Sequence, residues 1–227
     1  MNRLLISLHL PKTGGNSFLQ ALEAAFGPGL KQDYTDMSRI QAYLAGELAP
    51  EALAQAQPDI LAPGTRCIHG HFLAAKYLPL QRDHEIRFVT WLRDPVERLV
   101  SHYYFFRRSY DPNTAGPLFR RIVEEGWSLE TFCLSEEYRN LYSRYLWNFP
   151  YEAFDFIGLV EAYDKDLEYF SSRFLGRKVE ALRLNAATDS ERNERKIDPG
   201  LRRAIEDFHA QDVSLFRRAL RDREQRT

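Results

Sequence analysis

The sequence has little cysteine and almost no excess of charge. Its two cysteines, Cys67 and Cys133, lie far apart and form no CxxC pair. A cysteine-based zinc site is therefore excluded, and the pattern argues against a disulfide framework and favours a reducing, cytoplasmic setting. The 31 Lys and Arg residues against 32 Asp and Glu residues give a net charge of -1. This balance excludes a nucleic-acid-binding protein that works by bulk positive charge, although it leaves room for a local basic pocket.

The chain also lacks a long hydrophobic run. The first apolar stretch, residues 4–10, is interrupted by Ser7 and His9 and ends at Pro11. It is too short for the apolar region of a signal peptide or for a membrane span, which needs about 20 apolar residues. We therefore expect an unprocessed, soluble protein. Hydrophobic residues make up 44% of the chain, which supplies the core of a single domain over residues 1–227.

Strand-like and helix-like segments alternate along the sequence. The apolar patterns predict strands at residues 4–10, 67–72, 86–92, 154–160 and, at an edge, 179–184. Helices are predicted at 18–26, from 95 onward, at 163–175 and, as one amphipathic helix, at 201–220. Short helices are also predicted within 40–56, and residues 118–148 read as helical and aromatic. The alternation predicts an α/β fold in three layers, with a central, mostly parallel sheet flanked by helices.

The loop after the first strand has the features of an anion site. It reads Leu10-Pro11-Lys12-Thr13-Gly14-Gly15-Asn16-Ser17 and leads into a helix. Gly14 and Gly15 let the backbone approach a ligand, and the helix offers unpaired N–H groups at the positive end of its dipole. Lys12 adds a charge, while Thr13, Asn16 and Ser17 add side-chain donors. This combination favours a phosphate, although a simple turn with a helix cap remains an alternative.

A second anion site is predicted where the third predicted strand ends. Arg93 follows that strand and can hold a phosphate with paired N–H donors, while Ser101 offers a hydroxyl from the next helix. Because strand ends meet at the carboxyl edge of a parallel sheet, Arg93 and the Lys12 loop should share one edge. We expect Arg98 to be structural, in salt bridges with the nearby acidic residues Asp94 and Glu97.

The two motifs together resemble those of sulfotransferases that use 3′-phosphoadenosine 5′-phosphosulfate (PAPS). HLPKTGGNS is similar to the 5′-phosphosulfate loop of that superfamily, and RDPVERLVSHYY is similar to its 3′-phosphate motif. The resemblance is closest to the carbohydrate (heparan sulfate) 2-O-sulfotransferase-like branch. It implies a P-loop NTPase-like fold, PAPS as donor, PAP as product and no metal. It also implies that Lys12, Thr13, Gly14, Gly15, Asn16, Ser17, Arg93 and Ser101 bind the nucleotide.

His69-Gly70-His71 resembles the segment that supplies the catalytic base in the 2-O-sulfotransferase branch. The resemblance gives that role to His71, with Lys12 as the residue that stabilises the leaving group. A neutral imidazole suits removal of a hydroxyl proton near neutral pH. Two alternatives remain open: ordinary hydrogen-bonded histidines, or a metal site, for which we find no third ligand. His9 and His102 have no comparable context.

The acceptor should be a hydroxyl compound, and the resemblance suggests a sugar, with a glycan or a small metabolite both open. No nucleic-acid partner is expected. The aromatic residues that follow Ser101 could line an acceptor cleft or simply pack. The charged loop at 192–196 could close over the nucleotide, and Asp212 should be a structural partner or cap. A nucleotide or sugar kinase and a non-catalytic nucleotide-binding module are the alternative functions, although the loop lacks the GK[ST] sequence of a Walker motif.

Overall fold

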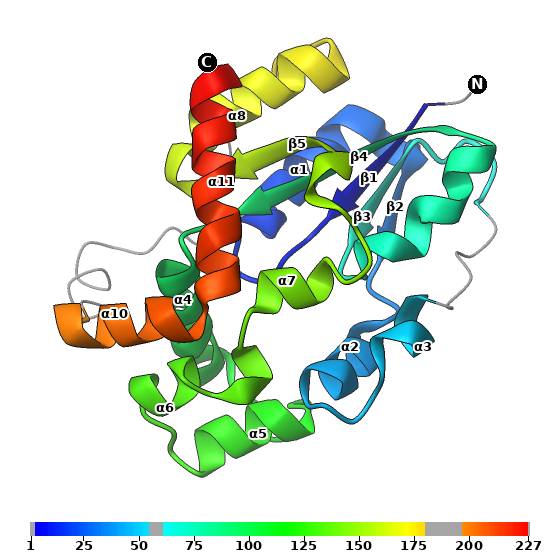
Figure 1. The fold of residues 1–227 in the computed structure, drawn as a ribbon. Helices are drawn as coiled ribbons and strands as arrows, with labels where there is room; N and C mark the ends of the chain where they lie inside the picture. Colours follow the sequence, from blue (N-terminus) through cyan, green and yellow to red (C-terminus); the bar gives the residue numbers. More distant parts are fainter. Residues whose placement is uncertain (1–2, 55–60, 180–196, 227) are drawn as a thin grey trace.

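A parallel sheet of five strands forms the centre of the protein. The computed structural model describes residues 3–54, 61–179 and 197–226. All neighbouring strands pair in parallel in the order β2-β3-β1-β4-β5 (Figure 1). The strands are β1 (Arg3–Leu8), β2 (Leu30–Asp33), β3 (Cys67–Gly70), β4 (Glu85–Leu92) and β5 (Phe154–Leu159).

Helices cover both faces of this sheet. On one face, α1 (Gly15–Phe26) and α8 (Tyr163–Phe170), with the π-helical turn Ser171–Leu175, enclose a core that includes Leu5 of β1. The core on the other face includes Leu4 of β1. The remaining helices are α2 (Met37–Leu44), α3 (Pro50–Ala54), α4 (Pro95–Ser109), α5 (Pro117–Glu124), α6 (Leu129–Cys133), α7 (Leu141–Tyr145), α10 (Pro199–Phe208) and α11 (Ala210–Arg226).

This architecture confirms the predicted three-layer α/β fold. The predicted strands at 4–10, 67–72, 86–92 and 154–160 are present, each one or more residues different in extent. Strand β2 was not predicted, because its sequence Leu-Lys-Gln-Asp has no apolar alternation and its pairing with β3 is what makes it a strand. The predicted edge strand at 179–184 lies outside the described residues, apart from its first position.

The single C-terminal helix predicted at 201–220 was wrong. The segment forms two helices, α10 and α11, which separate at His209. The His209 ring is fully buried, accepts a hydrogen bond from the amide of Asn140 at 3.1 Å and donates one to the Cys133 carbonyl at 2.7 Å. These long-range bonds fix the break, and no local sequence pattern encodes them. None of the described helices is both long and apolar enough to cross a membrane.

A buried ionic cluster fastens the end of β2. Lys76 Nζ, with its side chain only 5% exposed, lies 2.7 Å from Asp33 Oδ2 and 2.8 Å from Asp36 Oδ2. The Tyr77 hydroxyl donates a further hydrogen bond to Asp33. Burial alone would raise the pKa of Asp33, but the donors around it outweigh burial and lower the pKa to about 2. The cluster therefore holds β2 beside the chain that follows β3.

We predict that Lys76→Met lowers the free energy of unfolding by about 3–5 kcal/mol, because it leaves two carboxylates buried without their cation. Urea denaturation monitored by circular dichroism measures the change. The matched control is Arg39→Met, which removes the exposed cation 3.7 Å from Asp36 and should cost about 1 kcal/mol or less. Equal losses in the two variants would contradict the structural role of the cluster.

Candidate functional site

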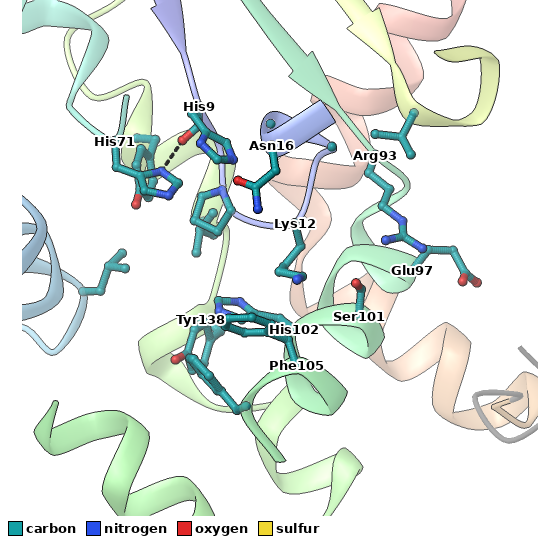
Figure 2. Close-up of a pocket in the computed structure, with 18 of the residues that line it drawn as sticks. His9, Lys12, Asn16, His71, Arg93, Glu97, Ser101, His102, Phe105 and Tyr138 are labelled. Carbon is teal, nitrogen blue, oxygen red and sulfur yellow. Dashed lines mark hydrogen bonds between the residues drawn. The ribbon is translucent and has the colours of Figure 1, made fainter. Parts of the chain in front are cut away.

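The order of the strands sets the order of the candidate site residues. β1 lies between β3 and β4, so the loop after β1 is flanked by the segments that follow those two strands. Lys12 lies in the loop after β1, the central strand, while His71 follows β3 and Arg93 follows β4. Figure 2 shows Arg93, Glu97 and Ser101 at one end and His71 at the other, with Lys12 and Asn16 between them. The sheet thus brings the two predicted anion sites and the predicted base to one edge, as expected for parallel strands.

The loop after β1 has an unusual backbone at its lysine. Lys12 has φ 66°, a left-handed conformation that costs a residue with a side chain about 1–3 kcal/mol. Its Nζ lies 4.0 Å from the centre of the Phe105 ring, so the side chain extends across the cavity (Figure 2). Strain at a charged residue that faces a cavity is typical of a binding site.

The two glycines of the loop are required for different reasons. Gly14 has φ 79°, which favours glycine, and it allows α1 to begin at Gly15. Gly15 has no room for a side chain, because a Cβ there would lie 1.9 Å from His9 Nε2. The backbone at the start of α1 therefore borders the cavity without a side chain in front of it at either glycine.

Thr13 differs from the prediction. Its side chain is 1% exposed, and its hydroxyl donates a 2.8 Å hydrogen bond to the Leu10 carbonyl. The hydroxyl thus stabilises the turn and is not a donor toward the cavity. The other predicted nucleotide-binding residues, and His71, all line the same cavity.

Hydrogen bonds from a tyrosine side chain fix the backbone of Arg93. The Tyr142 hydroxyl donates to the Arg93 carbonyl at 2.8 Å and accepts from the Arg93 amide at 3.2 Å. Tyr142 belongs to α7, whose start is capped by the buried Asp212 through the amides of Tyr142 and Ser143. Asp212 is therefore a helix cap, one of the two structural roles that the sequence suggested. The two bonds to Tyr142 engage only the backbone of Arg93. Its side chain lines the cavity and makes no ion pair with any described residue.

The predicted salt bridges of Arg98 were wrong. Asp94 uses one carboxylate oxygen to cap the amides of Val96 and Glu97 and the other to bind Arg202 at 2.9 Å. Glu97 also pairs with Arg202. Arg98 is instead fully buried, with its guanidinium 5.5 Å from the Tyr142 ring centre and no hydrogen-bond partner among the described residues. Its expected structural place is in the core beneath α4, in a cation–π contact with Tyr142.

His71 is oriented by a backbone hydrogen bond. Its Nδ1 donates to the carbonyl oxygen of His9, the contact drawn as a dashed line in Figure 2. A carbonyl can only accept, so Nδ1 carries the proton and Nε2 of the neutral ring keeps its lone pair. Burial lowers the pKa of His71 to about 4, with the bond to His9 opposing the shift. The ring is therefore a neutral proton acceptor at physiological pH.

His71 is one member of a stack of three histidines. The His9 ring lies 4.2 Å from the His71 ring and 5.1 Å from the His69 ring, centre to centre and nearly parallel. Burial lowers the pKa of His69 to about 3 and, together with charge repulsion from the other two rings and Lys12, lowers that of His9. The Ser7 hydroxyl lies 2.8 Å from His69 Nδ1, and Tyr34 Oη lies 3.1 Å from His9 Nδ1. The lowered pKa values of His9 and His69 keep these two rings neutral, so neither places a positive charge beside His71.

Gly70 lets the stack form. A Cβ at Gly70 would lie 1.7 Å from the carbonyl oxygen of Asp33 on the neighbouring strand β2. Any side chain there would separate β3 from β2 and move His69 and His71. No group of three or more His, Cys, Asp or Glu side chains is arranged to hold a metal ion within residues 3–54, 61–179 and 197–226.

These residues border one cavity of about 960 Å³. Phe105 and Phe106, two of the aromatic residues that the sequence offered as the lining of an acceptor cleft, do border it, whereas His9, His102 and Tyr138 were not predicted to do so. His9 could have been identified because it directly precedes the loop, on the strand that ends at the predicted edge. His102 could have been identified because it directly follows Ser101 on the same predicted helix. Tyr138 comes from a distant segment, and nothing in its local sequence marks it. The predicted loop at 192–196 lies outside the described residues.

Comparison with known protein families finds no match, and no curated protein sequence matches the chain. The crystal structure of the mouse sulfotransferase SULT7A1 complexed with PAP is similar, with a TM-score of 0.51 and 15% sequence identity over 100% of this chain and 90% of that chain. A sulfotransferase from Alicyclobacillus acidocaldarius has a TM-score of 0.45 and 17% identity over 95% of this chain and 94% of that one; this likeness is too weak to support an argument. The first likeness shows a shared fold.

We predict that the His71 ring is neutral and protonated on Nδ1 at about pH 6, because its lowered pKa of about 4 puts protonation well below that pH. Two-dimensional ¹⁵N–¹H spectra of the imidazole rings distinguish the two tautomers and the charged form. His71→Asn identifies the signal. A titration midpoint near the usual value of about 6.5, or a proton on Nε2, would contradict the assignment of the lone pair.

Proposed function

We propose that this protein transfers a sulfuryl group from PAPS to the hydroxyl group of an acceptor. One observation carries the proposal: a single cavity has donors for two separate anionic groups and a neutral histidine beyond them. PAPS has two such groups, a 3′-phosphate and a 5′-phosphosulfate, on one adenosine. The shared fold with a PAP-bound sulfotransferase supports the same reading.

Arg93 and Ser101 would hold the 3′-phosphate. The Arg93 guanidinium has no ion pair with a described residue, and Ser101 lies two turns along α4 on the same side of the cavity (Figure 2). A guanidinium can give two parallel hydrogen bonds to a phosphate. ATP and ADP lack a 3′-phosphate, so this end of the cavity would select the donor.

The Lys12 loop would hold the 5′-phosphosulfate. The amides at Gly14–Ser17 and the positive end of the α1 dipole suit a phosphate. As the bond between sulfur and the bridging oxygen breaks, its electron pair passes to the phosphate of PAP. Lys12 would stabilise that developing charge electrostatically, which requires no covalent intermediate.

His71 would take the proton of the acceptor. The acceptor oxygen forms the new bond to sulfur while the bond to the bridging oxygen breaks, and the hydroxyl proton moves to His71 Nε2. The Nδ1 bond to the His9 carbonyl orients the ring and stabilises the imidazolium that results. His71 lies on the opposite side of Lys12 from Arg93 (Figure 2), which suits attack in line with the leaving phosphate. The sequence resemblance alone would suggest a sugar as the acceptor, a suggestion that the lining of the cavity does not favour. The low cysteine content would place the protein in the cytoplasm.

A kinase and a non-catalytic nucleotide-binding module remain the alternatives. A kinase needs Mg-ATP and has no use for a 3′-phosphate site. A thermal-shift comparison separates a kinase from a sulfotransferase, because a tight ligand raises the melting temperature by mass action. A non-catalytic module is distinguished by the absence of turnover. PAP without Mg²⁺ should stabilise the protein more than ADP or ATP does. Stabilisation by Mg-ATP alone would exclude sulfuryl transfer.

We predict that Arg93→Gln weakens PAP binding by about 10–100-fold, the value of a hydrogen-bonded charge, while ADP binding changes little. Ser101→Ala should reduce PAP affinity in the same selective way, but less. Calorimetry with both nucleotides measures the ratio. Lys12→Met is the matched control, because it should weaken PAP and ADP together. A parallel loss of both ligands in Arg93→Gln would refute its assignment to the 3′-phosphate.

We predict that His71→Asn lowers kcat by about 10²–10⁴-fold, the usual contribution of a general base, with PAP affinity unchanged. The rate of PAP release from PAPS, measured chromatographically with a panel of sugar and apolar alcohols, gives kcat. The control is His84→Asn, a change at a histidine that does not line the cavity. Full activity in His71→Asn would show that another group takes the proton.

A further inference from the structure

We propose that the acceptor is an uncharged alcohol or phenol with an aromatic or apolar body. The inference rests on the proposed function, because it takes the part of the cavity beyond Lys12 to be the acceptor site. We call that part the acceptor chamber. Its walls are formed mainly by Met37, Ile40, Leu44, Phe106, Phe119 and Tyr145.

The chamber lies on the His71 side of the cavity. Met37, Ile40 and Leu44 come from α2, and Figure 2 shows the ribbon of this helix on the side where His71 lies. The opposite wall comes from α4, α5 and α7. An acceptor in the chamber would therefore present its hydroxyl between Lys12 and His71 Nε2, where transfer requires it.

The wall is built for apolar contact. The Phe106 and Phe119 rings stack with their centres 4.3 Å apart, and the His102 ring lies 4.4 Å from Phe106. Burial and the nearby charges of Arg98 and Lys12 lower the pKa of His102, so this ring is neutral. Apolar ligand surface that leaves water to contact this wall contributes favourably to binding, in proportion to the area buried. A flat aromatic body has the shape and surface to use it.

In the part of the chain that the structure describes, the charged residues of the cavity lie on the side proposed for the nucleotide, which we call the donor end. The charged lining residues in the described part of the chain are Lys12, Arg93, Glu97 and Arg202. Arg202 is bound to Asp94 and Glu97 at the start of α4, beside Arg93. No cation from the described segments lines the chamber itself, and Lys12 is assigned to the donor. A sulfated or uronate-bearing glycan would bury anions against leucine and phenylalanine, which is strongly unfavourable without a paired cation.

The chamber also offers few partners to a neutral sugar. Its polar side chains are Gln41, His102, Tyr138 and Tyr145, and neither tyrosine hydroxyl makes a hydrogen bond to another described residue. These groups can satisfy only some of the hydroxyls of a sugar, and each hydroxyl buried without a partner weakens binding. The whole cavity of about 960 Å³ must also hold the nucleotide, so the acceptor is small.

The test is calorimetric binding of three probes, each with and without saturating PAP. The probes are 2-naphthol, methyl β-glucoside and a disaccharide that contains glucuronate. We expect 2-naphthol to bind at least about tenfold more tightly than either sugar. Transfer from PAPS should follow the same order of preference. Binding of PAP is measured first, so that its absence refutes the proposed function separately.

Variants locate the probe in the chamber. Met37→Gln and Phe119→Gln should weaken 2-naphthol binding by about tenfold or more, with PAP affinity unchanged. Leu220→Gln is the matched control, because Leu220 is an exposed leucine on α11, away from the cavity. Tighter binding of either sugar, no binding of 2-naphthol, or equal effects in all three variants would overturn the inference while leaving sulfuryl transfer in place.

Discussion

The parallel pairing of β1 between β3 and β4 is the constraint on which the rest of the site depends. Each of these strands ends at the same edge and delivers one chemical group there: a histidine from β3, a lysine loop from β1 and an arginine from β4. The linear order of these groups across the cavity repeats the order of the strands. Because strand spacing is fixed by backbone hydrogen bonds, at about 4.8 Å, the separation of the groups is built into the sheet.

The electrostatic contrast along the cavity follows from the same arrangement. At the donor end, Arg93 and Arg202 lie near the start of α4, while Lys12 adjoins the start of α1. Toward the acceptor end, the histidines are buried and stacked, which lowers the pKa of His9, His69 and His71 and keeps them neutral. An anion is therefore favoured at one end and disfavoured at the other. Under the proposed function, this contrast would give the donor and the acceptor different places in one cavity.

The sequence predicts the parts of this structure that depend on local patterns. The apolar strands, the glycine loop and the spacing of Arg93 and Ser101 were all identifiable, and the structure places these residues around one cavity. The roles of residues that depend on tertiary contacts could not be identified from the sequence. Arg98 is buried over Tyr142 because Asp94 is already engaged by helix amides and Arg202.

Backbone pairing and packing explain the other differences. β2 has only one apolar residue in four, and β3 makes it a strand. The C-terminal helix breaks at His209 because that ring bonds to segments about 70 residues earlier, with sequence separations of 69 and 76. The role of Thr13 was misassigned because a hydroxyl next to a turn can bond to its own backbone. Local sequence contains no information on these choices between near and distant partners.

A crystal structure with bound PAP tests the central claim most directly. The account predicts one nucleotide in the cavity, with its 3′-phosphate on Arg93 and Ser101 and its 5′-phosphate on Lys12 and the amides that begin α1. His71 Nε2 should face the open side of the 5′-phosphate. A nucleotide that binds outside the cavity, or one whose two phosphates do not reach Lys12 and Arg93 together, would contradict it.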